Sequence, residues 1–238
     1  MNNLASIKQA WLEELSLFNS SPGIQRFFSG NATREHYKSI LREIYFHTRE
    51  NPQLQTFAAV FFKGDQRKYV KKFMAHASSE IGHDQLALND IATLGGDISN
   101  IPNERPLPET SALLAFGFYQ IQFLNPVGYL GYLFHLEFTP TSEGSAYMQA
   151  LEKIGIPKEA MTFLHDHTTI DIGHNKMMEG YAHDLIQNEQ DLEDVIYAMR
   201  VTAKLYTRML EAALERADKN KANLYGKNSG EINRRSKQ

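Results

Sequence analysis

Hydrophobic residues recur along most of the chain every three or four positions, which is the spacing of amphipathic helices. No stretch shows the period-two alternation and hairpin turns that indicate exposed strands. The predicted helices cover about residues 4–18, 33–50 with a break or kink at Asn51-Pro52, 54–62, 66–94, 111–124, 126–154 with a disturbance at Pro140, 157–186 and 191–217. The pattern therefore predicts an all-α protein of about seven or eight helices.

The longest predicted loop covers residues 95–110, and it is the only plausible linker. Amphipathic helices continue on both sides of it, and neither half looks able to bury a core alone. We therefore expect one single-domain helical bundle over residues 1–218, followed by a polar C-terminal tail over residues 219–238.

Composition limits the classes of function. The 238 residues carry a net charge of −3, which predicts no broad attraction to nucleic acid or acidic membranes. No apolar run approaches the roughly 20 residues that span a bilayer, and the first residues do not resemble a secretory signal. The chain has no cysteine, which excludes disulfides, thiolate ligands and cysteine nucleophiles. These features are compatible with a cytoplasmic protein that binds neither nucleic acid nor membrane.

Ionisable residues interrupt the apolar seam of the predicted helix 157–186. That seam consists of Ala160, Phe163, His167, Ile170, His174, Met177 and Tyr181. At about 100° per residue, Asp171 lies within an arc of roughly 60° that also contains His167 and His174. Three ionisable side chains are therefore predicted to point into the core together.

Two other predicted helices have the same feature. In the helix 66–94, Glu80 and Asp84 lie on the apolar seam, and His83 lies beside it, three residues after Glu80. In the helix after Pro126, Glu137 takes a seam position where leucine would be expected. A buried carboxylate costs several kcal/mol unless it is paired or coordinated, so these residues need a compensating partner.

Two compensations are possible. One is an inert network in which the histidines hydrogen-bond the carboxylates. The other is metal, because imidazole and carboxylate without sulfur suit iron, manganese or zinc. The six candidate ligands are Glu80, His83, Glu137, His167, Asp171 and His174. They are too many for one tetrahedral zinc and suit two ions that share carboxylates. We favour metal, since two carboxylate-x-x-His pairs and a third histidine occur together. No phosphate-binding loop, dinucleotide-binding motif or nucleophile elbow offers another chemistry.

The order of these elements resembles a known family. E-x-x-H at 80–83, a glutamate at 137 and H-x3-D-x2-H at 167–174 are similar to the haem-oxygenase-like di-iron oxidases and oxygenases. Those proteins belong to the superfamily of TenA-like (thiaminase-II-like) proteins. The resemblance implies a haem-oxygenase-like helical bundle with two iron ions, or manganese or a mixed manganese/iron pair. The implied ligands are Glu80, His83, Glu137, His167, Asp171 and His174.

The resemblance also implies an activity. We expect a non-haem oxidoreductase that uses O₂ to oxidise a small organic substrate, and a homodimer, since relatives are often dimers. Thiaminase-like hydrolysis uses a cysteine, which is absent, and haem oxygenase needs an axial histidine on its first helix, where this chain has none before His36. The alternative is a non-catalytic helical-bundle binding protein with an inert buried polar network.

Residues around the expected ligands are weaker candidates. His76 takes the position where some members place the first glutamate, and it is a side chain beside the ligands, an additional ligand or a surface histidine. We expect Asp84 beside the ligands. Aromatic side chains that could line a substrate pocket are Tyr45, Phe46, Tyr119, Tyr132, Phe134 and Tyr181. The repeated EIGH and DIGH sequences suggest that Gly82 and Gly173 allow neighbouring backbones to approach closely beside the liganding histidines.

Overall fold

The computed structural model describes residues 3–235, and it describes their side chains except at 169–172 and 223–235. Within residues 3–235 the chain forms nine α-helices and no strand. They are α1 Asn3–Ser20, α2 Pro22–Phe28, α3 Arg34–Val60, α4 Val70–Ser79, α5 His83–Thr93, α6 Pro108–Tyr119, α7 Tyr129–Lys153, α8 Thr162–Leu185 and α9 Glu189–Arg235. Short helical turns lie at Gly64–Tyr69, Ile101–Asn103, Gln120–Leu124, Pro126–Gly128 and Lys158–Ala160. The all-α prediction is confirmed.

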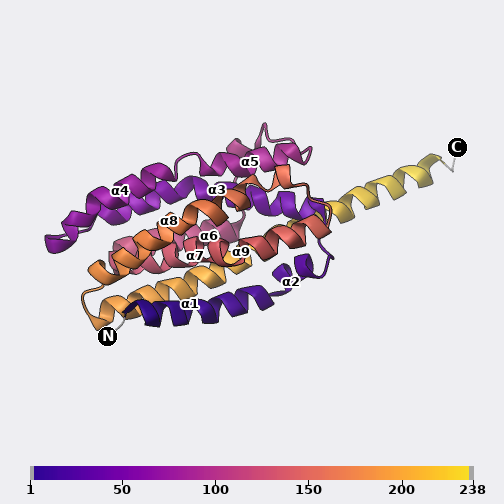
Figure 1. The fold of residues 1–238 in the computed structure, drawn as a ribbon. Coiled ribbons are helices and arrows are strands. Elements are labelled where there is room, and N and C mark those ends of the chain that lie inside the picture. The colour runs from indigo at the N-terminus through magenta and orange to yellow at the C-terminus, as the bar shows by residue number, and fades with distance from the viewer. Residues whose placement is uncertain (1–2, 236–238) are drawn as a thin grey trace.

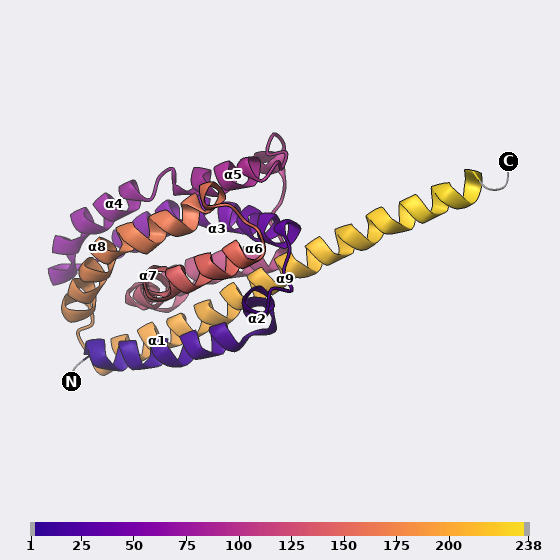
Figure 2. The same cartoon turned by 45° about the vertical axis from the view of Figure 1, so that its right-hand side comes forward.

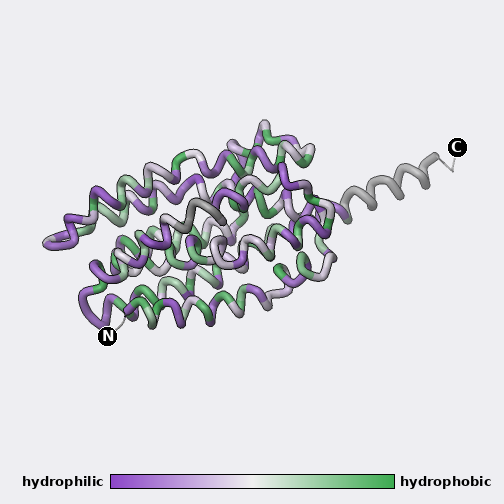
Figure 3. Tube along the Cα trace, in the orientation of Figure 1, coloured by the Kyte–Doolittle hydropathy of each residue, from purple (hydrophilic) through white to green (hydrophobic). Residues whose placement is uncertain are grey.

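Helix α7 lies in the middle of the bundle, with α3 and α8 on one side and α1 and α9 on the other (Figures 1 and 2). Its side chains Tyr129, Tyr132 and Phe134 are fully buried. At Gly131 a Cβ would lie 2.0 Å from the Val195 carbonyl oxygen, so α7 can approach α9 this closely only with glycine. Hydrophobic and hydrophilic residues mix along each helix, as expected for amphipathic helices around one core (Figure 3).

The C-terminal part of α9 projects beyond the bundle (Figures 1 and 2). Helix α9 continues into the segment 219–238, which the sequence predicts to be a polar tail, and the division of the chain at residue 218 stays a prediction. None of the described helices is long and apolar enough to cross a membrane.

The predicted helix breaks at two prolines are wrong, whereas a kink at Pro52 stays a prediction. Helix α3 runs through Pro52 and α7 runs through Pro140 without interruption. A proline inside a helix removes a hydrogen bond at a cost of about 3 kcal/mol, and here the residues on both sides of each proline bury apolar surface that offsets it. After Pro140, the Thr141 hydroxyl donates to the carbonyls of Glu137 and Phe138 and supports the following turn.

The single helix predicted over residues 66–94 is also wrong. A 3₁₀ turn at Gly64–Tyr69 leads into α4, which ends at Ser79, and α5 begins at His83. Between them Gly82 has φ +102°, a left-handed conformation that a side chain disfavours. The hydrophobic spacing could not reveal this break, because α4 and α5 present apolar residues to the same core. Glu80 therefore lies at the end of one helix and His83 at the start of the next.

Candidate metal centre

Four buried side chains from three segments meet in the core. The ligand atoms of His76, Glu80, Glu137 and His174 all lie within 4.8 Å of one another. His76 and Glu80 come from the end of α4, Glu137 from α7 and His174 from α8. Every member is at least nine-tenths buried. This group, the inner quartet, has two carboxylates and two imidazoles around one small space.

A second group overlaps the inner quartet. The ligand atoms of Glu80, His83 and His167 also lie within 4.8 Å of one another, and this outer trio is half-buried at His83 and His167. Glu80 belongs to both groups. The two carboxylate oxygens of Glu80 lie near different histidines, Oε1 at 3.5 Å from His174 Nδ1 and Oε2 at 3.2 Å from His83 Nδ1. One carboxylate thus lies between two sets of nitrogen donors.

The cap at the start of α8 positions the histidines of that helix. Asp90, a fully buried residue of α5, accepts hydrogen bonds from the Thr162 amide at 2.9 Å, the Thr162 hydroxyl at 2.6 Å and the Phe163 amide at 3.0 Å. Capping by a carboxylate satisfies amides that the first helical turn leaves unpaired. The start of α8 is thereby fixed against α5, and His167 and His174 follow at one and three turns.

The tautomer of His167 follows from a backbone contact. Its Nδ1 lies 2.7 Å from the carbonyl oxygen of Phe163. A carbonyl only accepts, so Nδ1 carries the proton and donates it, which leaves Nε2 with a lone pair. A metal-binding histidine is commonly held in this way.

Several polar atoms in these groups have no hydrogen-bond partner within the described part of the chain. They are both ring nitrogens of His76, Oε1 of Glu80 and Nδ1 of His83. Buried polar atoms are nearly always hydrogen-bonded, and each unpaired one costs about 1–3 kcal/mol. Within the described residues, the ion pairs of Glu80 and Glu137 involve only histidines. In this part of the chain, neither carboxylate therefore has a lysine or arginine partner, and several buried atoms of the cluster lack a hydrogen bond.

The ionisation of these groups reflects their mutual contacts. Burial raises the pKa of Glu137, but its hydrogen bond with His174 and its charge interactions with the imidazoles of His174 and His76 outweigh burial and hold the pKa well below its usual range. The Glu80 carboxylate beside His83 raises the pKa of that imidazole, whereas burial lowers the pKa of His167. Glu137 is therefore ionised at neutral pH, as a metal ligand must be.

The donor set fits iron. It contains imidazole nitrogen and carboxylate oxygen without sulfur, the combination that suits iron or manganese in helical bundles. A cation would supply a partner for the unpaired atoms of His76, Glu80 and His83 and would offset the charge of Glu80 and Glu137.

The structure brings together five of the six ligands predicted from sequence. Glu80, His83, Glu137, His167 and His174 lie in the two groups, and the side chain of Asp171 lies outside the described residues. His76, which the sequence left open as a neighbour of the ligands, an additional ligand or a surface residue, is buried and belongs to the inner quartet. Its position four residues before Glu80, on the same face of α4, was the available signal. Asp84 lies in neither group and accepts from Gln85 at the surface.

Of the six aromatic residues that the sequence suggests for a substrate pocket, five are buried and one is exposed. Tyr45, Phe46, Tyr132, Phe134 and Tyr181 are buried, and Tyr119 is 50% exposed. The Tyr132 hydroxyl donates to Asn51 at 3.1 Å and lies 2.6 Å from His47 Nε2, which donates to it. Phe134 stacks on Phe138, and Tyr181 packs against Phe73. Their role in a substrate pocket stays a prediction.

The explanation of EIGH and DIGH by close backbone approach is wrong. A Cβ at Gly82 or Gly173 would meet nothing within 4 Å in the described part of the chain. Gly82 is required instead for its positive φ at the α4–α5 break, whereas Gly173 lies exposed in the interior of α8. The two glycines therefore have different physical roles despite the repeated spelling.

A protein-family model decides the family. The family is described as iron-containing redox enzymes, and its model matches residues 38–207, which include every member of both ligand groups. The chain belongs to this family. No curated protein with which the chain was compared matches it.

Solved structures share the fold of this chain. A domain of unknown function with a heme oxygenase-like fold from Shewanella denitrificans is 26% identical, with a TM-score of 0.84, and the alignment covers 90% of this chain and 93% of that one. A TenA homologue from P. horikoshii is 11% identical, with a TM-score of 0.71 and coverage of 90% and 98%. Heme oxygenase-1 from the cyanobacterium Synechocystis, solved with heme, is 11% identical, with a TM-score of 0.72 and coverage of 96% and 99%. The fold of the iron-containing redox enzyme described here is thus heme oxygenase-like.

Proposed function

We propose that this iron-containing redox enzyme is a non-haem oxidase or oxygenase that holds two iron ions and uses O₂ to oxidise a small organic substrate. The observation that supports it is the sharing of Glu80 between two overlapping groups of ligand atoms. A carboxylate between two sets of nitrogen donors is the arrangement that two adjacent metal ions require. The unpaired buried atoms around Glu80 favour metal over an inert network.

Each side chain has a distinct part in this proposal. His76, Glu137 and His174 would hold one ion, His83 and His167 the other, and Glu80 would contact both. Bound iron supplies the redox chemistry with O₂ that the side chains themselves lack. The quartet is at least nine-tenths buried, and the Phe163 carbonyl keeps the proton of His167 on Nδ1.

Metal loading tests the proposal. The purified chain is incubated anaerobically with Fe(II), desalted and analysed for iron per chain, and a parallel sample receives Mn(II). We expect two ions per chain and an absorbance change when O₂ is added to the iron form. His167→Ala should lower the iron content, because it removes a nitrogen donor from the outer trio. A folded chain that binds neither metal would contradict the proposal and favour the inert network.

The partners proposed from sequence are O₂, a small organic molecule and a second copy of the chain. Light scattering of the eluting protein measures the last of these. We expect the mass of a homodimer, and a mass of one chain at all concentrations would reject that part of the proposal.

A further inference from the structure

An apolar cavity of about 130 Å³ lies between α1, α2, α3, α7, α8 and α9. Its walls include Phe18, Phe27, Ile40, Leu41, Leu151 and Leu210. A dry cavity of about 150 Å³ lined by such residues can bind benzene, so this one accommodates an apolar group of about that size. Since close packing is the rule in protein interiors, a cavity of this volume is a candidate binding site.

A buried histidine in the cavity wall has no partner. His135 of α7 lines the cavity and is fully buried, and neither of its ring nitrogens makes a hydrogen bond within the described residues. The ring contacts Phe18 and Tyr206 edge-on, with centroid distances of 6.1 and 6.0 Å. A buried polar group without a hydrogen bond costs about 1–3 kcal/mol, so a polar ligand atom beside His135 would recover that loss.

The cavity walls also determine the charge of the ligand. No lysine, arginine, aspartate or glutamate is among its lining residues in the described part of the chain. A charged group would be desolvated there without a counter-ion, which costs far more than an uncharged group that hydrogen-bonds. The site therefore favours a molecule that is mainly apolar and carries one uncharged hydrogen-bonding group.

The cavity adjoins the candidate metal centre through one residue. His167 belongs to the outer trio and also forms part of the cavity wall. Its ring stacks on Phe163, another wall residue, at a centroid distance of 4.1 Å. A molecule in the cavity would thus lie beside a proposed ligand of the metal.

We propose that this cavity binds a mainly apolar molecule whose single uncharged hydrogen-bonding group pairs with His135, and that this molecule is the substrate oxidised at the metal centre. The second part rests on the proposed function, and the first does not. The class includes small alcohols, phenols and amides, and it excludes carboxylate and ammonium compounds.

Trp11 is a natural reporter for this cavity. It is the only tryptophan of the chain. Its Nε1 lies 3.4 Å from the hydroxyl oxygen of Thr139, and Thr139 lines the cavity. Occupation of the cavity should therefore change the fluorescence of Trp11.

The test measures binding to the metal-free chain. Hexanol, hexanoate and hexylammonium are titrated separately, with Trp11 fluorescence and calorimetry as readouts. We expect saturable binding of hexanol and at least tenfold weaker binding of the two ions. Equal or tighter binding of hexanoate or hexylammonium would overturn the inference about charge, and no saturable binding of hexanol would overturn the site.

Three variants locate the ligand. His135→Leu should weaken hexanol binding about tenfold without lowering the thermal unfolding temperature, because it removes polar atoms that have no partner. His135→Gln, which keeps a donor and an acceptor, should bind hexanol more tightly than His135→Leu. Ile24→Phe fills the half-buried rim of the cavity and should abolish binding. Unchanged hexanol affinity in both His135→Leu and Ile24→Phe would reject the assignment.

The two proposals can fail independently. Iron loading without hexanol binding would remove the cavity from the reaction and leave the proposed function intact. Hexanol binding without iron loading would leave a ligand site and reject its link to oxidation. When the chain both loads iron and binds hexanol, hexanol should slow the O₂-dependent absorbance change of the wild-type iron form or be consumed in that reaction. At the same hexanol concentration, His135→Leu should abolish this effect of hexanol.

Discussion

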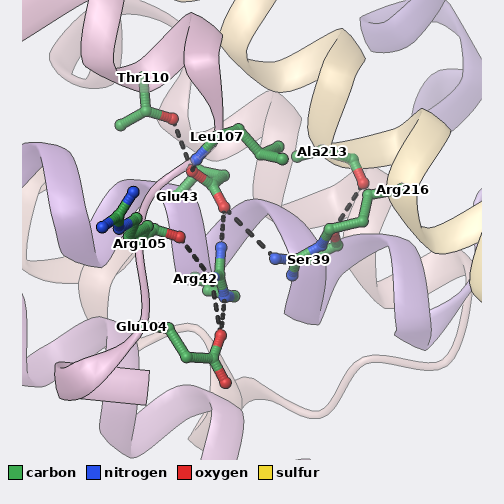
Figure 4. Close-up of polar contacts among 9 residues, drawn as sticks. All are labelled: Ser39, Arg42, Glu43, Glu104, Arg105, Leu107, Thr110, Ala213 and Arg216. Carbon is green, nitrogen blue, oxygen red and sulfur yellow. Dashed lines mark hydrogen bonds and ion pairs between the residues drawn. The ribbon is translucent and has the colours of Figure 1, made fainter.

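The cost of burying a carboxylate charge is offset in different ways at two places in this bundle. Glu43 of α3 is fully buried and accepts from the guanidinium of Arg42, from the Leu107 amide at 2.9 Å and from the Thr110 hydroxyl at 2.6 Å, with Arg216 at 3.5 Å (Figure 4). Arg42 also pairs with Glu104, so its charge is shared between two carboxylates (Figure 4). Both carboxylate oxygens of Glu43 therefore have hydrogen-bond donors.

Glu80 and Glu137 are almost as deeply buried, and their recorded ion-pair partners are all histidines. Histidines are ligands as well as donors, whereas a guanidinium can only donate. Burial of a carboxylate alone therefore does not indicate a metal site. What distinguishes the two groups is the nature of the partners and the number of atoms left unpaired.

Glu80→Gln should have the largest effect on metal content. Because Glu80 belongs to both groups, its loss should lower iron to near zero per chain in the loading experiment. The matched control is Glu43→Gln, which makes the same chemical change at a fully buried glutamate outside the cluster. Iron per folded chain should stay at the wild-type value in the control. Equal iron loss in both variants would show that metal content depends only on general stability.

The order of the two variants should be reversed when the stability of the metal-free chain is measured, with the larger loss for Glu43→Gln. Glu43→Gln leaves Arg42 and Arg216 without their shared acceptor and should lower the free energy of unfolding by about 3 kcal/mol. Glu80→Gln removes a negative charge that is not paired with a lysine or arginine. It should change the free energy of unfolding by less than about 1 kcal/mol. Urea unfolding of the metal-free variants measures both values. A larger loss for Glu80→Gln would mean that the cluster is a stabilising network.

His47 is a buried histidine whose partner, the Tyr132 hydroxyl, is uncharged, and its effect on stability should be smaller and depend on pH. Burial lowers the pKa of His47 from 6.5 to about 3, with a further contribution from His167. Below about pH 6.5 the unfolded chain therefore binds a proton that the folded chain does not, and stability falls as pH falls. His47 contributes a slope of about 1.4 kcal/mol per pH unit between those two values.

His47→Gln keeps a donor for the Tyr132 hydroxyl and removes this titration. Urea unfolding of the metal-free chain over this pH range should show a flatter acid side for the variant than for wild type. Parallel pH profiles would show that His47 is protonated in the folded state.

The smallest effects should come from the glycines of EIGH and DIGH. Gly82→Ala forces a side chain into the left-handed region and should cost about 1 kcal/mol, while Gly173→Ala, in open space on α8, should stabilise by about 0.5–1 kcal/mol. Gly82→Ala should also reduce iron binding, because it moves Glu80 relative to His83. Thermal unfolding and iron content measure these changes. The same sign for both variants would contradict the different roles assigned to the two glycines.

Much of the architecture could be predicted from sequence, because amphipathic spacing reflects burial directly. Helix ends were harder where a local signal competed with packing. The prolines at 52 and 140 signal a break, and the buried surface around them outweighs it. The opposite occurred at Gly82, where continuous apolar spacing hid a break between two helices.

The candidate site could be predicted from the ionisable residues that replace apolar ones on helix seams. Sequence spacing could not show that His76 belongs to the inner quartet, since that depends on where α4 ends. It also could not show that Glu80 is common to both groups, because that depends on how α5, α7 and α8 pack. The apolar cavity beside His135 was missed, since its walls come from six helices and each wall residue looks like ordinary core.

The cap that Asp90 forms on α8 also limits how the sequence can vary. An insertion of one residue rotates the following helix by about 100° and shifts it by about 1.5 Å. Because Asp90 holds the helix at Thr162, an insertion before His174 would turn that histidine away from the inner quartet. An insertion after α8 would leave the ligands in place. The segment from Thr162 to His174 should therefore tolerate insertions and deletions least. The turn between α8 and α9 should tolerate them best.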